Sequence, residues 1–318
     1  MIEKSSKMEG NAVIDAHCDL LYQLWRHDYN VNQSDALQFD LEKWRASPIK
    51  VQAFAIFVPD TTPLNQQFDV ALKMIDLFYE KIVLPNPDII QIQSKLELEN
   101  LQPHQLGAML TLEGCHPIGT DLNNLVRLID EGVRIVGLTW NNNNAVSDSV
   151  MSIEGKGVSR FGEEVIQLLN AEQILTDVSH LSVRGFDDVI DQADHVIASH
   201  SNAYRICQHR RNLTDQQIKA IIKRDGLIGV TFVPEFTKSS DFVSIDDLFE
   251  HIDHFIELGA EDQLCFGSDF DGITNTISGL ENVTGYHRFK KELFDHYSRR
   301  IVNKISNDNF TRKFPRIN

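Results

Sequence analysis

The sequence contains few of the residues on which disulfide-stabilised or linker-rich proteins depend. Only four of its 318 residues are cysteine, and no two of them form a C-x-x-C pair. Four cysteines in a chain of this length do not make a disulfide framework, so we expect structural thiols. Nine prolines and 17 glycines are too few for a linker-dominated or collagen-like protein. The remaining composition, 42% hydrophobic and 24% charged, is typical of a globular chain.

Long hydrophobic runs and an excess of basic charge are absent as well. No stretch reaches 18 consecutive apolar residues, which excludes a membrane-spanning helix. The first 20 residues mix both charge signs without an apolar core, so we expect no secretory signal, and no hydrophobic C-terminal tail offers a lipid anchor. With 46 acidic against 30 basic residues, the formal net charge of −16 disfavours a nucleic-acid partner. These absences predict a cytoplasmic protein that binds neither membrane nor nucleic acid.

Short apolar segments of strand length recur along the chain. Their hydrophobicity is continuous rather than alternating, as expected for parallel strands covered on both faces. Segments with helical spacing, such as the one around Val165, Leu168 and Leu169, lie between them. The eight segments are residues 12–16, 51–58, 106–112, 133–139, 174–178, 195–199, 227–232 and 264–267. Eight strand–helix alternations predict an α/β fold of the (β/α)8 TIM-barrel type, and an open doubly wound sheet is the alternative.

Three further stretches do not fit the simple alternation. Residues 28–50 and 60–105 exceed ordinary loops, and we expect them to be helical decorations on a single barrel domain spanning residues 1–318. From residue 285 onward, nine basic residues stand against three acidic ones, and apolar residues recur every four positions from Phe289 to Ile305. This period predicts a helical segment at about 285–318 whose apolar stripe docks on the barrel.

Polar side chains with ligand or acid–base chemistry follow the predicted strands, at the barrel end where active sites of this architecture lie. Because alternate residues of a strand share a face, His17 and Asp19 after the first strand point into the barrel mouth and Cys18 points away. The corresponding residues after later strands are Glu113, His180, His200 and Asp269. Each one alone is more typical of a capped turn or a buried hydrogen bond. Their shared position at strand ends favours a common site.

Imidazole and carboxylate donors in such a set suit zinc or a similar divalent ion. The five residues His17, Asp19, Glu113, His180 and His200 exceed the three protein ligands of a mononuclear catalytic zinc site. They fit two metal ions bridged by one carboxylate, an arrangement that clamps a hydroxide between the ions. The sequence therefore predicts a dinuclear metal centre.

Six short motifs occur in a fixed order along the chain. They are Asp15-Ala16-His17-Cys18-Asp19, Leu112-Glu113-Gly114, Val178-Ser179-His180, Ser199-His200-Ser201-Asn202-Ala203, Arg210-Arg211-Asn212 and Gly267-Ser268-Asp269-Phe270-Asp271-Gly272. Together with the closing segment Ile305–Phe314, this order resembles that of the membrane (renal-type) dipeptidases, peptidase family M19 of the amidohydrolase superfamily. The resemblance extends from about Val13 to the C-terminus.

The resemblance implies a zinc-dependent barrel that hydrolyses dipeptides and tolerates a D-residue at the C-terminal position. It implies one Zn²⁺ on His17, Asp19 and Glu113 and a second on Glu113, His180 and His200, with Glu113 bridging. Arg211 matches the residue that binds the terminal carboxylate of the substrate, a role that suits the guanidinium geometry. Asp269 matches the active-site aspartate that exchanges protons with the nucleophilic water and the leaving amine.

The chain departs from the family after the fourth predicted strand. Where many members have Thr-His, it reads Thr139-Trp140-Asn141, so the histidine that donates to the carbonyl oxyanion is missing. Loss of one such donor costs on the order of 10²–10³ in rate unless Asn141 or a neighbouring asparagine replaces it. We expect Trp140 and Asn141 to line the substrate pocket, and packing of Trp140 under the barrel rim is the alternative.

The sequence therefore predicts a metallo-dipeptidase with two Zn²⁺ that cleaves L-L and L-D dipeptides by a metal-bridging hydroxide. A homodimer is compatible with this prediction. Two other hypotheses stay open. One is a hydrolase of the same superfamily that acts on an N-acyl amino acid, a lactone or a cyclic amide. The other is a metal-binding barrel in which Trp140 has impaired catalysis.

Overall fold

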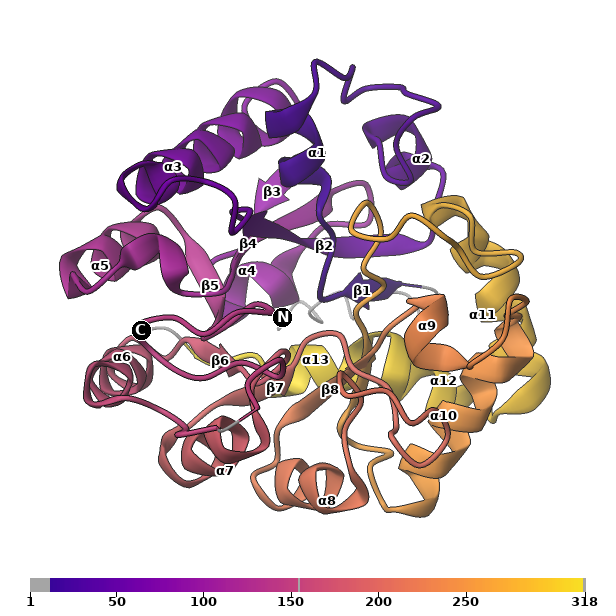
Figure 1. Ribbon diagram of the computed structural model, residues 1–318. Coiled ribbons are helices and arrows are strands. Elements are labelled where there is room, and N and C mark those ends of the chain that lie inside the picture. Colours follow the sequence, from indigo (N-terminus) through magenta and orange to yellow (C-terminus); the bar gives the residue numbers. More distant parts are fainter. Residues whose placement is uncertain (1–11, 154, 317–318) are drawn as a thin grey trace, which may run out of the picture.

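The computed structural model describes residues 12–153 and 155–316. Parallel strands form a central barrel, and helices surround it (Figure 1). The strands are β1 (Val13–Asp15), β2 (Ile49–Phe57), β3 (Ile89–Gln91), β4 (Leu106–Glu113), β5 (Val133–Gly137), β6 (Leu175–Asp177), β7 (Val196–Ala198), β8 (Leu227–Val230) and β9 (Leu264–Phe266). Neighbouring strands follow the order β2-β1-β9-β8-β7-β6-β5-β4, and pairing of β2 with β4 closes the ring. The predicted (β/α)8 barrel is confirmed, and the open sheet is excluded because the ring has no free edges.

Each of the eight predicted segments coincides with a barrel strand, and β3 is the strand that the sequence pattern did not reveal. It contains only three residues and lies inside the 60–105 stretch. It pairs in parallel with the first residues of β4, where Ile89 is opposite Leu106, and β5 pairs with β4 only from Leu110 onward. The additional strand therefore extends the sheet beside the beginning of β4 and leaves the barrel at eight strands.

Several of the α-helices begin at residues whose side chains satisfy free backbone amides. The hydroxyl of Ser159 accepts a hydrogen bond from the amide of Gly162 before α6, and Thr214 forms a capping box with Gln217 before α8. The helices are α1 (Leu20–Arg26), α2 (Leu41–Arg45), α3 (Gln67–Leu77), α4 (Lys95–Asn100), α5 (Leu122–Asp130), α6 (Arg160–Ala171), α7 (Val183–Gln192), α8 (Asp215–Lys223), α9 (Pro234–Thr237), α10 (Ile245–Glu257), α11 (Tyr286–His296), α12 (Arg299–Asn303) and α13 (Asn309–Lys313). Short 3-10 turns at 64–66, 116–118 and 283–285 and π-helical turns at 78–83 and 304–308 join them.

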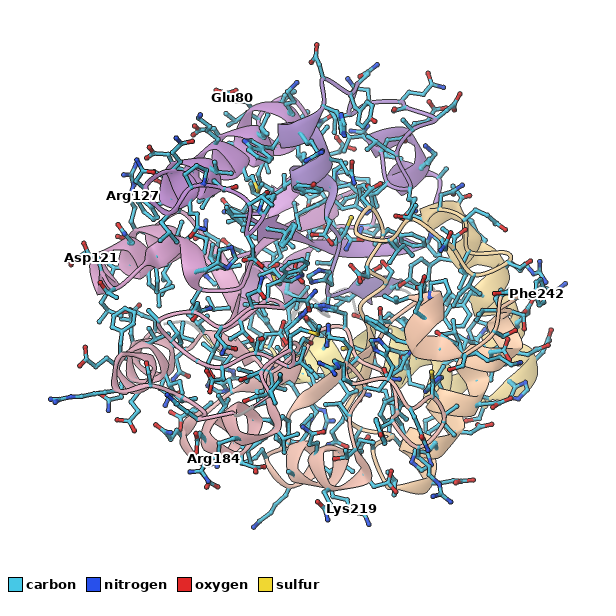
Figure 2. All side chains as sticks on the ribbon, in the orientation of Figure 1. Glu80, Asp121, Arg127, Arg184, Lys219 and Phe242 are labelled. Atoms are coloured by element: carbon cyan, nitrogen blue, oxygen red, sulfur yellow. The ribbon has the colours of Figure 1, made fainter. Side chains whose placement is uncertain are left out.

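Charged side chains of the outer helices point away from the barrel. Figure 2 shows this for Arg127 on α5, Arg184 on α7 and Lys219 on α8, and all three are exposed. The opposite faces of these helices are apolar, for example Leu125 and Leu128 on α5, which are fully buried. The helix ring thus has the amphipathic pattern that its spacing predicts.

The C-terminal segment packs against the barrel, but it is not one helix. Apolar residues recur every four positions through Tyr297, yet α11 ends at His296 and Tyr297 adopts an extended conformation. The hydroxyl of Ser298 then caps the new helix α12 by accepting from the amide of Ile301. The Tyr297 hydroxyl is held outside the helix because it donates to Asp253 Oδ1 at 2.8 Å. The prediction of one continuous helical stripe is therefore wrong at this residue.

The end of the segment covers the barrel end at which the strands begin. In Figure 1, α13 lies behind the strands, and the Asn309 side-chain amide donates to the carbonyl oxygens of Glu261 and Leu264. Phe310 and Phe314 pack with the inward-pointing strand residues, and both are almost fully buried. The barrel is filled and capped at this end, so a site open to substrate lies at the opposite end, where the strands finish.

The structure places no helix long and apolar enough to span a membrane within residues 12–153 and 155–316. The predicted absence of a leader concerns mainly residues 1–11, which lie outside the described part of the chain.

All four cysteines are buried free thiols, as expected from their isolated positions. Burial raises the pKa of Cys115 and Cys265, which favours the unreactive thiol form. Their role in the fold is that of small apolar residues.

His251 on α10 makes the fold sensitive to acid. Its Nδ1 accepts a hydrogen bond from the Ala203 amide at 3.0 Å, and its Nε2 donates to the Thr237 carbonyl at 2.8 Å. Burial lowers the pKa of His251 to about 4, so the native ring is neutral, whereas the unfolded ring has an ordinary pKa near 6.5. The unfolded chain therefore binds more protons between these values, and His251 alone should reduce the free energy of unfolding by about 3 kcal/mol as the pH falls through this window.

Denaturant unfolding at pH 7 and at pH 4.5 measures this effect. The free energy of unfolding of His251→Gln should fall less over this interval than that of the wild type, although the variant is less stable at pH 7. Equal losses in the two proteins would contradict this role of His251.

Candidate metal centre

Asp15, the last residue of β1, holds the ends of β1 and β9 side by side. Its Oδ1 accepts from the backbone amides of His17 at 3.2 Å and Ser268 at 2.9 Å. Its Oδ2 accepts from the hydroxyl of Tyr286 at 2.9 Å. These bonds fix the backbone that carries His17 and Asp19 on one strand end and Asp269 on the other.

Asp177, the last residue of β6, does the same for β6 and β7. Its Oδ1 accepts from the backbone amides of Ser179 and Ser199, both at 2.9 Å. Its Oδ2 accepts from the Ser199 hydroxyl at 2.5 Å. His180 and His200 follow immediately and lie next to each other.

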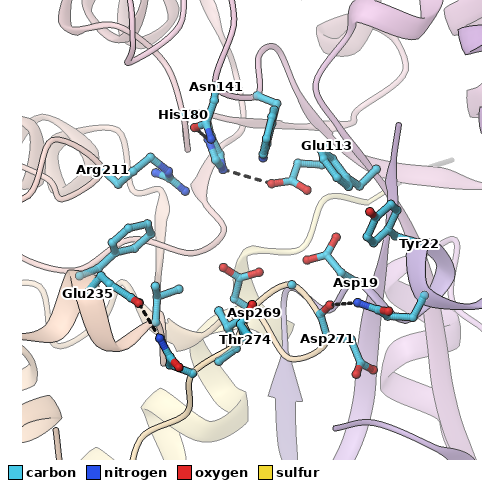
Figure 3. Close-up of a pocket in the computed structure, with 18 residues that line it drawn as sticks. Asp19, Tyr22, Glu113, Asn141, His180, Arg211, Glu235, Asp269, Asp271 and Thr274 are labelled. Carbon is cyan, nitrogen blue, oxygen red and sulfur yellow. Dashed lines mark hydrogen bonds and ion pairs between the residues drawn. The ribbon is translucent and has the colours of Figure 1, made fainter. Parts of the chain in front are cut away.

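Glu113, at the end of β4, lies between these two groups with one carboxylate oxygen toward each. Its Oε1 is 3.1 Å from His180 Nε2 and 3.5 Å from His200 Nε2. Its Oε2 is 3.7 Å from His17 Nε2, which in turn lies 3.4 Å from Asp19 Oδ2. All five residues are buried. Figure 3 shows Glu113 facing His180 across the pocket from Asp19 and Asp269.

Hydrogen bonds at Nδ1 orient two of the three imidazoles. His180 Nδ1 donates to Asn141 Oδ1 at 2.9 Å, and His200 Nδ1 donates to the Ser199 hydroxyl oxygen at 2.7 Å. In these tautomers both Nε2 atoms carry a lone pair, yet they are only 3.0 Å apart. Such lone pairs repel unless a cation or a proton lies between them, and a partner at Nδ1 is usual for metal-binding histidines.

The electrostatics of the cluster also favour a cation. Burial, with Arg211 and His17 nearby, lowers the pKa of His180 and His200 well below the usual range, so both are neutral and able to bind a metal. Burial opposes a charge on His17 as well, but the carboxylates of Glu113 and Asp19 raise its pKa to about 10. Burial and the Asp19 carboxylate raise the pKa of Glu113 well above its usual range. These carboxylates therefore need positive charge beside them.

The backbone is strained where it presents two of these side chains. His180 and Asp269 have positive φ angles of 68° and 69°, in the left-handed region that non-glycine residues seldom adopt. Strain of this kind costs of order 1–3 kcal/mol for each residue and is concentrated at functional sites. Gly114 has a φ of 87°, and a Cβ there would lie 3.0 Å from the Trp140 amide nitrogen. Glycine therefore lets the chain after Glu113 approach the loop that carries Asn141.

The residues present fit a metal centre. His17 Nε2 and Asp19 Oδ1 are buried without a hydrogen-bond partner among the described residues, which is costly for polar atoms that no ligand satisfies. Two sets of closely spaced donor atoms share His17, namely His17 with Glu113 and His200, and His17 with Asp19 and Asp269. The second set places Asp269 near the predicted ligands, with its Oδ1 3.8 Å from His17 Nε2. The cluster thus offers ligand atoms that suit a divalent metal ion.

A cavity of about 490 Å³ opens over this cluster. Trp140, Asn141, Arg211 and Asp269 all line it, so the structure brings the residues expected to bind substrate together with the candidate ligands. Asn141 was expected to contact the substrate. Its Oδ1, however, accepts the hydrogen bond from His180 Nδ1. Trp140 is half-buried and lines the pocket wall.

Arg211 reaches the cluster from the loop before α8. It is 6% exposed, its Nη2 donates to the His200 carbonyl at 3.3 Å, and its Nε has no hydrogen-bond partner within residues 12–153 and 155–316. Its guanidinium carbon lies 5.4 Å from the centre of the Phe236 ring. Burial lowers the pKa of Arg211 to about 10, so the side chain stays charged at neutral pH.

The sequence pattern did not assign a role to Asp15, Asp177 or Ser199. Asp15 and Asp177 are buried acids at the ends of apolar strand segments, and that position was the available signal. Ser199 directly precedes His200, but only the structure shows that its hydroxyl connects Asp177 to the imidazole.

The family pattern of the membrane dipeptidases (peptidase family M19) matches residues 3–318. A dipeptidase of Schizosaccharomyces pombe, itself uncharacterised, is 30% identical over 300 residues, which cover 86% of this chain and 72% of that protein. A metallopeptidase from Rhodobacter sphaeroides, solved with a phosphinate mimic of the dipeptide L-Ala-D-Ala, has a TM-score of 0.90 and 25% identity over 96% of this chain and 99% of its own. The M19 dipeptidase AC has a TM-score of 0.87 and 27% identity over 96% of this chain and 98% of its own. The chain therefore belongs to the membrane dipeptidase family, peptidase family M19, and is a metallo-dipeptidase.

Proposed function

We propose that this metallo-dipeptidase uses two zinc ions bridged by Glu113 to hydrolyse L-L and L-D dipeptides. The observation that supports this most is the position of Glu113, whose two oxygens face different groups of donors. His17 and Asp19 would hold one ion with Glu113, and His180 and His200 would hold the other. Histidine and carboxylate donors are those that zinc accepts in catalytic sites. The Rhodobacter relative with its L-Ala-D-Ala mimic supports extension of the substrate range to a C-terminal D-residue.

Divalent ions bound here would lower the pKa of water to near neutrality and polarise the carbonyl of the scissile peptide bond. The chain's own residues supply positioning and proton transfer. Asp269 lines the pocket beside His17, and its carboxylate would take a proton from water and deliver it to the leaving amine. The hydrogen bonds at Asn141 and Ser199 keep the imidazoles in the tautomer that leaves Nε2 free.

Arg211 would select short peptides by binding their terminal carboxylate. Its Nε has no partner in the part of the chain that the structure describes, and its charge is enclosed, so a carboxylate would form a strong charge-assisted hydrogen bond there. The contact to the His200 carbonyl holds the guanidinium close to the candidate ligands. A longer peptide would have to place an uncharged amide against this group, which leaves part of its charge unpaired.

A metal count combined with a hydrolysis screen tests this proposal. Purified protein loaded with zinc should hold about two ions per chain and should cleave L-Ala-L-Ala and L-Ala-D-Ala. Hydrolysis of N-acyl amino acids, lactones or cyclic amides without cleavage of any dipeptide would contradict the proposed substrate class. One tightly bound ion per active chain would contradict the dinuclear centre.

Replacing Arg211 with alanine should raise KM for dipeptides by roughly tenfold to a hundredfold, because a hydrogen bond to a charged group contributes about 1.5–3 kcal/mol. Steady-state kinetics on L-Ala-L-Ala measure the change, and the zinc content should remain that of the wild type. Arg210→Ala is the matched control, since this neighbouring arginine is exposed. Unchanged kinetics in Arg211→Ala would show that the arginine does not bind the substrate carboxylate.

A further inference from the structure

The pocket differs in chemistry at its two ends. Figure 3 shows Arg211 and Glu235 at one end and Tyr22 at the other, with Glu113 and Asp269 between them. The Arg211 end carries opposite charges and one aromatic ring, Phe236, beside the guanidinium. Toward the Tyr22 end, Phe57 and Trp140 add two more rings to the lining.

Tyr22, Phe57 and Trp140 form a continuous aromatic wall. The rings of Tyr22 and Phe57 meet edge to face with centroids 5.3 Å apart, and those of Phe57 and Trp140 are 4.8 Å apart. The three residues come from α1, from the last position of β2 and from the loop after β5. All three are half-buried, so part of each side chain faces the pocket.

This aromatic wall begins directly beside the candidate metal ligands. Phe57 is opposite Glu113 in the β2–β4 pairing, and the Trp140 ring lies 6.2 Å from the His180 ring. Tyr22 follows Asp19 by three residues. A substrate whose scissile carbonyl lies over the ligand cluster therefore has the wall within reach on the side away from Arg211.

We propose that the aromatic wall is the subsite for the side chain of the N-terminal residue, and that the enzyme prefers dipeptides with an aromatic or large apolar residue there. This inference rests on the proposed function, because the Arg211 contact sets the substrate direction. One residue spans about 3.3–3.6 Å, so only the C-terminal residue fits between the carboxylate held by Arg211 and the scissile carbonyl. The N-terminal residue then lies toward Tyr22, Phe57 and Trp140.

Apolar burial gives the expected size of the preference. An aromatic side chain removed from water against such a wall should raise kcat/KM on the order of tenfold to a hundredfold over an alanine side chain. The gain should depend on the rings of the wall and on the position of the aromatic residue in the dipeptide.

The experiment compares kcat/KM for Phe-Ala, Ala-Phe and Ala-Ala in the zinc-loaded enzyme and its variants. The wild type should prefer Phe-Ala to Ala-Ala by about tenfold or more. Phe57→Ala and Trp140→Ala should each reduce this ratio severalfold while the zinc content stays unchanged. Trp140→Phe, which keeps an aromatic ring, should retain most of the preference. The control is Phe242→Ala, an exposed surface phenylalanine that lies outside the pocket lining and should leave all three rates unchanged.

Several results would overturn the inference. Equal rates for Phe-Ala and Ala-Ala would remove the preference while leaving the dipeptidase proposal intact. A preference for Phe-Ala that persists in both Phe57→Ala and Trp140→Ala would show that the aromatic wall does not cause it. The ratio of kcat/KM for Ala-Phe to that for Ala-Ala is the further comparison. If it falls in these variants as much as the ratio of Phe-Ala to Ala-Ala, the wall contacts the C-terminal residue instead. Cleavage of no dipeptide by the zinc-loaded wild type would contradict the proposed function, and the subsite with it.

Discussion

Replacing Glu113 with glutamine is expected to reduce the bound zinc to less than about half of the wild-type content and kcat/KM by on the order of 10³ or more. The carboxylate faces both sets of donors, with Oε1 3.1 Å from His180 Nε2 and Oε2 3.7 Å from His17 Nε2. Glutamine keeps the shape of the side chain but loses the negative charge that would bind both ions. Elemental analysis of metal per chain and steady-state hydrolysis measure the two effects.

The metal-free Glu113→Gln variant should be at least as stable as the metal-free wild type. Burial and the neighbouring Asp19 raise the pKa of Glu113, which means that its charged form is unfavourable in the absence of a cation. Thermal unfolding of both apo proteins therefore separates loss of metal from loss of fold. Glu172→Gln, at the exposed end of α6, is the matched control and should keep full zinc content. Wild-type metal content in Glu113→Gln would contradict the bridging assignment.

Loss of His180 should remove one of the two proposed zinc ions and nearly all activity. His180 Nε2 is the donor nearest to Glu113, and its Nδ1 is already held by Asn141 Oδ1 at 2.9 Å. No other described side chain between β6 and α7 offers an imidazole or thiolate to replace it. Zinc content per chain and kcat/KM on L-Ala-L-Ala are the measurements.

Two substitutions at His180 distinguish the loss of a metal ligand from the effect of backbone strain on stability. The residue has a φ of 68°, which asparagine tolerates better than alanine does. His180→Asn should therefore unfold at a higher temperature than His180→Ala while lacking the same zinc ion. His254→Asn is the control, because the imidazole of His254 pairs with Asp215 at 2.8 Å, away from the pocket lining. A fully active His180→Asn variant with two zinc ions would show that His180 is not a ligand.

The strands were predictable because parallel strands covered on both faces need continuous apolar segments, and eight such segments are visible in the sequence. β3 was not predictable in this way, since three residues are too few to show a pattern. The break at Tyr297 was hidden for another reason. The four-residue period continues through it, and the contact of Tyr297 at the break is with Asp253, a residue 44 positions away.

The candidate ligands were predictable from their place at strand ends, but their supporting contacts were not. His17 and Asp19 share a face because side chains alternate along a strand, which is a local property. The bonds of Asp15 to the Ser268 amide and of Asp177 to the Ser199 amide join residues far apart in the chain. Such partners depend on which strands become neighbours.

The barrel, the types of donor at its strand ends and the family follow from the amino-acid sequence alone. Hydrophobic continuity, alternation along a strand and motif order are properties of short stretches of chain. The folded chain is needed to show that the two oxygens of Glu113 face different histidines, and that Arg211 and Tyr22 lie at opposite ends of one pocket. These arrangements arise from closure of the ring of strands. Pairing of β2 with β4 brings residues that are far apart in the sequence to within hydrogen-bonding distance. No local sequence pattern specifies those distances.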